Sequence, residues 1–107
     1  MQLENYSAVK FKKELLTIIQ KYPELKDSKV FIFGSRVRGD NFSRADIDIG
    51  LESNSSIPAL IKYKFKQEID NLPLLYKIDL IDFNQVSPDF KNEALKNIEY
   101  VYPTQQT

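Results

Sequence analysis

Cysteine and histidine are both missing from this chain of 107 residues. Their absence excludes disulfides, zinc sites with thiolate or imidazole ligands, and catalytic schemes in which a histidine moves a proton. Any metal bound by the chain must therefore be a hard cation held by oxygen ligands.

Net charge and long apolar runs are missing as well. The 15 basic and 15 acidic residues cancel, so no strong field draws the chain onto duplex nucleic acid or an anionic membrane. We expect no direct nucleic-acid binding, whereas a small polyanionic ligand stays open. No apolar run approaches the roughly 20 residues that span a bilayer, and the N-terminus has no signal-like apolar core. The expected location is the cytoplasm, without membrane contact.

Length and composition predict one folded domain over residues 1–107. This length is close to the commonest domain size and leaves no room for a second core. Apolar residues make up 42% and aromatic residues 12% of the chain, which is ample material for a core.

Apolar periodicity predicts the order helix, strand, turn, strand, helix, strand, helix. The strands are expected at 29–33, which should be buried on both faces, and at 46–51 and 76–83. Pro23 should close the first helix, side chains of the loop 53–56 should cap the second, and Ser87-Pro88 should open the last. The inward residues should be Phe11, Leu15, Ile18, Ile19 and Tyr22, then Ile57, Leu60, Ile61, Phe65 and Ile69, then Phe90, Ala94, Leu95 and Ile98. We expect an α/β (α+β) fold, a small mixed β-sheet covered by helices, with a frayed tail at 103–107.

Two carboxylates lie two residues apart on the second predicted strand. Asp46 and Asp48 should leave the same face, where they can converge on one or two cations. Two magnesium ions serving phosphoryl or nucleotidyl displacement need a further carboxylate from another element. Asp79 and Asp82 are the candidates, and only one can face the site because they lie three residues apart on a strand. A solvated strand face is the plainer interpretation of the Asp pair.

A glycine–serine turn follows the first predicted strand. Gly34 and Ser35 should begin a helical turn whose free N–H groups and small hydroxyl can approach phosphate oxygens. Arg36 and Arg38 add forked donors, although both could be ordinary surface charges. This pattern predicts a phosphate site that faces the metal site.

These residues resemble the minimal nucleotidyltransferases of the DNA polymerase β-like superfamily. The signature of that family is Gly-Ser, about ten residues, and Asp-x-Asp, which here reads Gly34-Ser35, ten residues and Asp46-Ile47-Asp48. Its fuller pattern appears as GSRVRG, ADIDI and IDLID. The resemblance implies a polymerase β-like fold with a catalytic core at about 28–102, and it makes Asp79 the third carboxylate.

The reaction that the resemblance implies is transfer of AMP from ATP. Asp46, Asp48 and Asp79 would hold two Mg²⁺ ions, and a hydroxyl would attack the α-phosphate while pyrophosphate leaves. The phosphates would lie at Gly34, Ser35, Arg36 and Arg38.

Small members of this family resemble the antitoxins of toxin–antitoxin pairs, in which the partner is a helical HEPN ribonuclease. This implies AMPylation of a tyrosine on the toxin, and an oligomer formed with it. Two alternatives stay open, a non-catalytic antitoxin that acts by contact and a transferase for a small molecule such as an aminoglycoside.

Two further groups of residues have plain structural interpretations. The tyrosines are expected to be packing or rim aromatics, although one of them could stack on adenine; they are Tyr63, Tyr76, Tyr100 and Tyr102. The lysine run Lys62, Lys64 and Lys66 is expected on the solvated side of the second helix.

Overall fold

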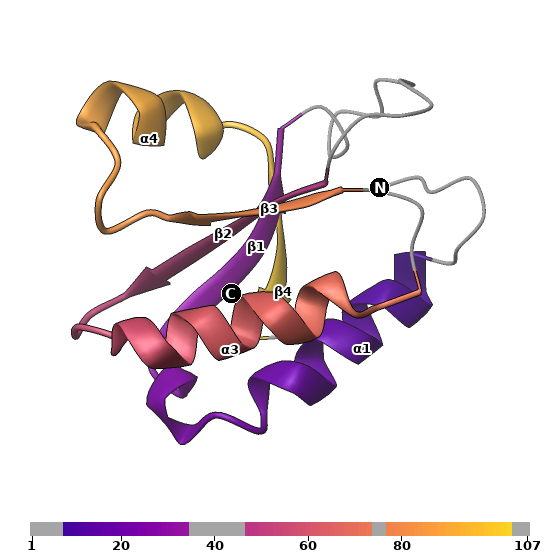
Figure 1. Ribbon diagram of the computed structural model, residues 1–107. Coiled ribbons are helices and arrows are strands. Elements are labelled where there is room, and N and C mark those ends of the chain that lie inside the picture. The colour runs from indigo at the N-terminus through magenta and orange to yellow at the C-terminus, as the bar shows by residue number, and fades with distance from the viewer. Residues whose placement is uncertain (1–7, 35–46, 74–76, 104–107) are drawn as a thin grey trace.

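A mixed sheet with helices on both faces forms the fold (Figure 1). The computed structural model describes residues 8–34, 47–73 and 77–103. Its elements are α1 (Ala8–Ile19), η1 (Pro23–Leu25), β1 (Ser28–Phe33), β2 (Ile47–Ser53), α3 (Ala59–Asp70), β3 (Ile78–Asp82), α4 (Pro88–Ala94) and β4 (Ile98–Tyr102). Helices α1 and α3 lie on one side of the sheet and α4 on the other (Figure 1). This arrangement confirms the expected α/β class.

The sheet has the strand order β3-β2-β1-β4. β1 pairs antiparallel with both β2 and β4, whereas β2 and β3 are parallel and are connected through α3. The C-terminal end of β1 is therefore at the same end of the sheet as the N-terminal ends of β2 and β3. β1 is central, as predicted, with Val30 and Ile32 in one core cluster and Phe31 and Phe33 in another.

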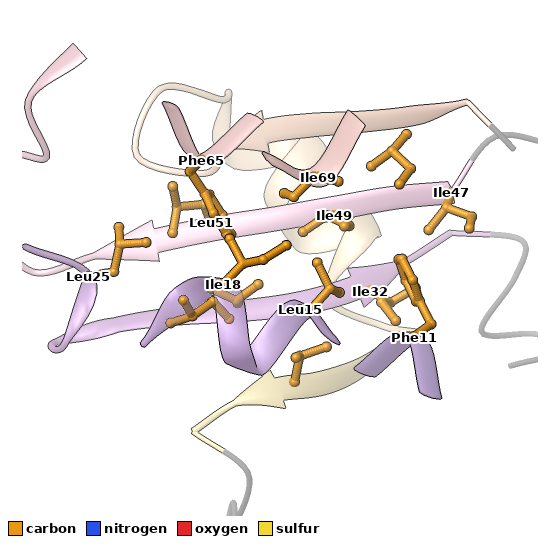
Figure 2. Close-up of a cluster of buried hydrophobic side chains, with 14 residues drawn as sticks. Phe11, Leu15, Ile18, Leu25, Ile32, Ile47, Ile49, Leu51, Phe65 and Ile69 are labelled. Atoms are coloured by element: carbon orange, nitrogen blue, oxygen red, sulfur yellow. The ribbon is translucent and has the colours of Figure 1, made fainter. Parts of the chain in front are cut away.

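The larger core cluster fills the space between the sheet and helices α1 and α3 (Figure 2). Alternation along β2 sends every second residue into it, because successive strand residues face opposite sides. Helical spacing does the same on α1 and α3. The residues labelled in the figure are Phe11, Leu15, Ile18, Leu25, Ile32, Ile47, Ile49, Leu51, Phe65 and Ile69.

A smaller aromatic cluster lies between the sheet and α4. Phe31, Phe33 and Phe83 are its buried members, and Phe31 and Phe83 meet edge-to-face with ring centroids 4.9 Å apart. Gly50 makes room for them, because a Cβ at that position would lie 2.3 Å from the Phe31 ring. The second face of the sheet is thus closed by aromatic rings over a glycine.

The last predicted helix was too long. Helix α4 ends at Ala94, and Ile98 begins β4, which pairs antiparallel with β1. Ile98 lies four residues after Ala94 and so matched a helical pattern, but the segment IEYVY is rich in β-branched and aromatic residues that favour a strand. Pairing with β1 decides the outcome, and β4 is the element that the sequence reading missed.

Other details of the helices also differ from the expectations. The residue before α3 is Pro58 and makes no side-chain cap bond, so loop 53–56 does not cap this helix. Leu60 and Phe90 were expected to face inward but are 60% and 44% exposed. Helix α1 ends at Ile19, and Pro23 begins the short helix η1 instead of closing α1 directly. None of the described helices has the length and apolar character to cross a membrane.

Candidate functional site

Two carboxylates meet at one end of the sheet, on the face that carries α4. Asp48 near the start of β2 is the direct register partner of Asp79 on β3. Paired residues on neighbouring strands lie roughly 5 Å apart and point to the same face. Both carboxylates are partly exposed, and the Asp79 side chain retains 36% of its accessible surface. The two acids are therefore positioned to share one cation, and their role as metal ligands stays a prediction.

Gly34 completes this corner of the sheet from β1. Its backbone has φ = 87°, a left-handed conformation that side-chain-bearing residues rarely adopt. A Cβ there would lie 3.0 Å from Asp48 Oδ2. The absence of a side chain thus lets the Asp48 carboxylate lie close to the backbone of Gly34.

Asp82 lies on the opposite face of β3. Its carboxylate accepts a hydrogen bond from Lys62 Nζ on α3 at 2.8 Å and another from the Asn84 backbone N–H at 2.9 Å. Its register partner on β2 is Leu51, which belongs to the core beneath α1 and α3. Asp82 therefore faces away from Asp48, whereas Asp79 lies on the same face as Asp48. The role of Asp79 as the third carboxylate stays a prediction.

A pocket adjoins Gly34 on the side away from Asp79. It has a volume of ≈ 180 Å³ and is lined by Phe33, Gly34, Phe90, Glu93, Ala94 and Asn97. Ser87 Oγ caps α4 by accepting the Phe90 N–H, as predicted for the start of this helix, and Lys91 forms an ion pair with Glu52 of β2. These contacts fix α4 over the sheet. Sequence reasoning did not find the pocket, because its lining comes from three separate elements.

Comparison with known proteins identifies the family. The family model described as polymerase beta, nucleotidyltransferase matches residues 13–107. The chain belongs to the polymerase β nucleotidyltransferase family. Asp48, Asp79 and Gly34 accordingly lie at the sheet end of a nucleotidyltransferase fold.

The chain is also similar to individual proteins in sequence or in fold. The chain is 26% identical over 101 residues to the probable protein adenylyltransferase MntA of Haemophilus influenzae, covering 92% of this chain and 88% of that protein. It is similar in fold to a toxin–antitoxin crystal structure with AMP-PNP, with a TM-score of 0.68 and 19% identity, covering 89% of this chain and 75% of that one.

A second fold match comes from Shewanella oneidensis. It is a complex of a tri-AMPylated HEPN toxin with an MNT antitoxin, with a TM-score of 0.65 and 17% identity, covering 92% of this chain and 74% of that one.

The donor set suits a hard divalent cation. Carboxylate oxygens are the ligands that Mg²⁺ prefers, and one or two of them commonly suffice when a phosphate supplies the rest. Lys77 Nζ lies 4.0 Å from Asp79 Oδ1 but its side chain is 73% exposed, so this weak ion pair can open. Among the described residues no cluster of three potential metal-ligating side chains occurs. A cation here would rest on the Asp48–Asp79 pair together with donors from beyond those residues or from the nucleotide.

Four predicted site residues lie outside the described residues. They are Ser35, Arg36, Arg38 and Asp46. Their proposed roles in phosphate and metal binding remain predictions.

The tyrosines of the described part of the chain lie away from the carboxylate pair. Tyr63 is 60% exposed on α3 and accepts a hydrogen bond from Gln67, and the Tyr102 hydroxyl donates to the Lys26 carbonyl. Tyr100 packs on the aromatic cluster beneath α4. These positions agree with packing and rim roles, and Tyr76 lies outside the described residues.

The lysine run on α3 does not form one solvated row. Lys62 is partly buried, and its ion pair with Asp82 joins α3 to β3. Lys66 pairs with Asp70 one turn along the same helix.

Proposed function

We propose that this chain is a magnesium-dependent nucleotidyltransferase that transfers AMP from ATP to a hydroxyl group of a partner protein. The observation that carries the proposal is the Asp48–Asp79 pair, on one face of adjacent strands and next to a left-handed glycine. Metal-assisted displacement at phosphorus commonly uses carboxylates that hold the cation next to the reacting phosphate.

Asp48 and Asp79 would share one magnesium ion. In the proposed arrangement of two ions, Asp46 would be a third carboxylate ligand. When bound, Mg²⁺ neutralises charge on the phosphate oxygens and polarises them. Gly34 has no side chain to crowd the Asp48 carboxylate, since a Cβ there would lie 3.0 Å from Asp48 Oδ2. The proposed phosphate contacts at Ser35, Arg36 and Arg38 would orient the β- and γ-phosphates.

Asp79 also has the exposure to take part in the proton transfer. Its carboxylate can accept the proton of an incoming hydroxyl as the new oxygen–phosphorus bond forms at the α-phosphate. The bond from that phosphorus to the β-phosphate oxygen breaks, and pyrophosphate leaves. Asp82 cannot substitute for it, because its carboxylate faces α3 and is held by Lys62.

The proposed partner is a HEPN-type toxin, and the proposed acceptor is a tyrosine hydroxyl on it. Support comes from the relative named as a protein adenylyltransferase and from the fold match to an MNT antitoxin in complex with an AMPylated HEPN toxin. On this proposal the chain acts in the cytoplasm as an antitoxin, and AMP transfer inactivates the toxin within a complex of the two proteins.

The proposal is tested by incubating the chain and its toxin partner with Mg²⁺ and ATP labelled at the α-phosphate. Label should appear on the toxin with the wild type and should be lost with Asp48→Asn. If Asp48→Asn labels the toxin as fast as the wild type does, the assigned site is wrong. In cells, survival of toxin expression with Asp48→Asn, despite absent labelling, would instead indicate an antitoxin that acts by contact alone.

A further inference from the structure

The pocket beneath α4 is the part of this end of the molecule to which the proposed reaction assigns no role. It opens beside Gly34, where a Cβ would also lie close to the Asp48 carboxylate. Its volume of ≈ 180 Å³ is below the 300–1,000 Å³ usual for a whole small-molecule ligand. A space of this size can take one ring system of a ligand whose remainder lies outside.

The lining combines an aromatic ring with polar groups at one rim. Phe90 is 44% exposed, although its ring packs against Phe33 and Phe83 with centroids 6.2 and 5.8 Å away. The contacts with Phe33 and Phe83 fix the orientation of a ring that still has accessible surface. Base stacking on such a ring contributes to nucleotide binding regardless of sequence.

Glu93 and Asn97 supply the polar rim. The Asn97 amide can donate to and accept from the edge of a base at once, as amides do with adenine. Glu93 pairs with Lys96 at 3.1 Å, but both side chains are more than half exposed, so the pair is weak and can open. The 6-amino group of adenine could donate to this carboxylate, whereas guanine has a carbonyl oxygen there that the carboxylate would repel.

We propose that the pocket between α4 and the end of β1 binds the adenine ring of the nucleotide donor. This inference rests on the proposed function, and it names the pocket that would select the nucleotide donor. Phe90 would stack on the base, and Asn97 and Glu93 would read its edge.

The position of the pocket favours the donor over the acceptor. The strand order places Asp79 on β3, Asp48 on β2, Gly34 after β1 and Asn97 before β4, so these four lie across the sheet end in that order. The acceptor hydroxyl must approach Asp79, on the β3 side. The pocket lies on the β4 side of Gly34, which leaves it for the nucleoside.

The test compares two probes, Mg·ATP and magnesium tripolyphosphate, in binding titrations of the full chain. Tripolyphosphate uses the phosphate site alone, so the wild type should bind ATP about ten-fold more tightly or better. Phe90→Ala should weaken ATP binding by about ten-fold and leave tripolyphosphate binding unchanged. The control is Leu60→Ala, an exposed apolar residue of α3, which should change neither affinity.

A second variant keeps the proposal testable if Phe90→Ala disturbs α4. Asn97→Ala should reduce the preference for ATP over GTP several-fold with tripolyphosphate binding intact, which a merely structural effect would not do. Unchanged ATP affinity and unchanged ATP preference in the two variants would overturn the adenine pocket alone. A loss of affinity for the protein acceptor instead of for ATP would also overturn it. A wild type that binds neither probe would contradict the proposed function itself.

Discussion

Asp48 and Asp79 lie side by side as partners in the parallel pairing of β2 and β3. The two residues are 31 positions apart in the sequence, and the intervening α3 connection brings them together. Because the register of a parallel pair fixes which face each side chain occupies, the pairing places both acids on one side of the sheet. The site is thus a consequence of strand register, and changes elsewhere on β3 test it.

Asp82→Asn is the first such change. The wild-type carboxylate joins Lys62 and the Asn84 N–H on the face away from the site, so AMP transfer should stay within about two-fold of wild type. The unfolding free energy should fall by about 1 kcal/mol or less, as for a partly exposed ion pair. Denaturant unfolding and labelled transfer measure the two effects. A large loss of activity in a folded Asp82→Asn would mean that the side chains of β3 have been assigned to the wrong faces of the sheet.

Gly34→Ala should damage both stability and activity. The left-handed backbone costs a side-chain-bearing residue about 1–3 kcal/mol, and the new Cβ would crowd Asp48 Oδ2 at 3.0 Å. We expect a lowered unfolding midpoint and a transfer rate that falls further than the lost stability explains. Assays well below the unfolding temperature separate the two. Wild-type transfer by Gly34→Ala would show that the space beside Asp48 is not used.

Gly50→Ala offers a contrasting case within the same strand. Its Cβ would meet the buried Phe31 ring at 2.3 Å and the Phe83 ring at 2.9 Å, so overpacking should cost about 1–3 kcal/mol. Thermal unfolding measures that loss. The fraction that remains folded at low temperature should still bind tripolyphosphate, since Gly50 does not border the carboxylates. A fully stable Gly50→Ala would contradict the close packing of Phe31 and Phe83 over Gly50.

Glu68 on α3 should give the stability a pH dependence at the acid end. A hydrogen bond from Lys21 and a second from Tyr22 lower the pKa of Glu68 below its ordinary value of 4.5. A lowered carboxyl pKa contributes stability above the unfolded pKa that is lost as pH falls through the folded pKa. The difference in unfolding free energy between wild type and Glu68→Gln should therefore be constant above about pH 5 and shrink below it.

Tyr22, which donates to Glu68, should give the stability a pH dependence of opposite sign at alkaline pH. The hydrogen bond to Glu68 is the main cause that raises the pKa of Tyr22 above 10.0. Its neutral hydroxyl contributes stability below that value, and this contribution is lost as pH rises through the raised pKa. Tyr22→Phe should remove this alkaline loss. Identical pH profiles for the variants and the wild type would show that the contact contributes nothing.

Much of the fold could be predicted from periodicity, and the exceptions have physical causes. Alternation along β2 and the apolar run of β1 identified strands whose faces are set by burial. Ile98, the first residue of β4, matched the helical spacing of the last predicted helix, and only pairing with β1 decides that it belongs to a strand. Helical spacing also placed Leu60 and Phe90 on the buried side of their helices. Both are exposed, because periodicity does not show how far a neighbouring element covers that side.

The site was predictable to the extent that a local motif carried it. Strand alternation placed Asp46 and Asp48 on one face, and the three-residue spacing of Asp79 and Asp82 allowed only one of them to share it. The family pattern favoured Asp79, and the bond from Lys62 to Asp82 on the other face agrees with that preference. The pocket beneath α4 has no local signal. Phe33 is far in the sequence from Phe90 and Asn97, and the three residues line one pocket only when β1, α4 and the start of β4 are in place.

The most direct test of the Asp48–Asp79 site is the initial rate of AMP transfer as a function of Mg²⁺ concentration, compared between wild type, Asp79→Asn and Asp82→Asn. We predict that Asp79→Asn transfers AMP at a rate at least about 100-fold below that of the wild type, and that it needs more Mg²⁺. Asp82→Asn should have the rate and the Mg²⁺ dependence of the wild type. Transfer by Asp79→Asn at the wild-type rate, with the wild-type Mg²⁺ dependence, would contradict a shared cation site.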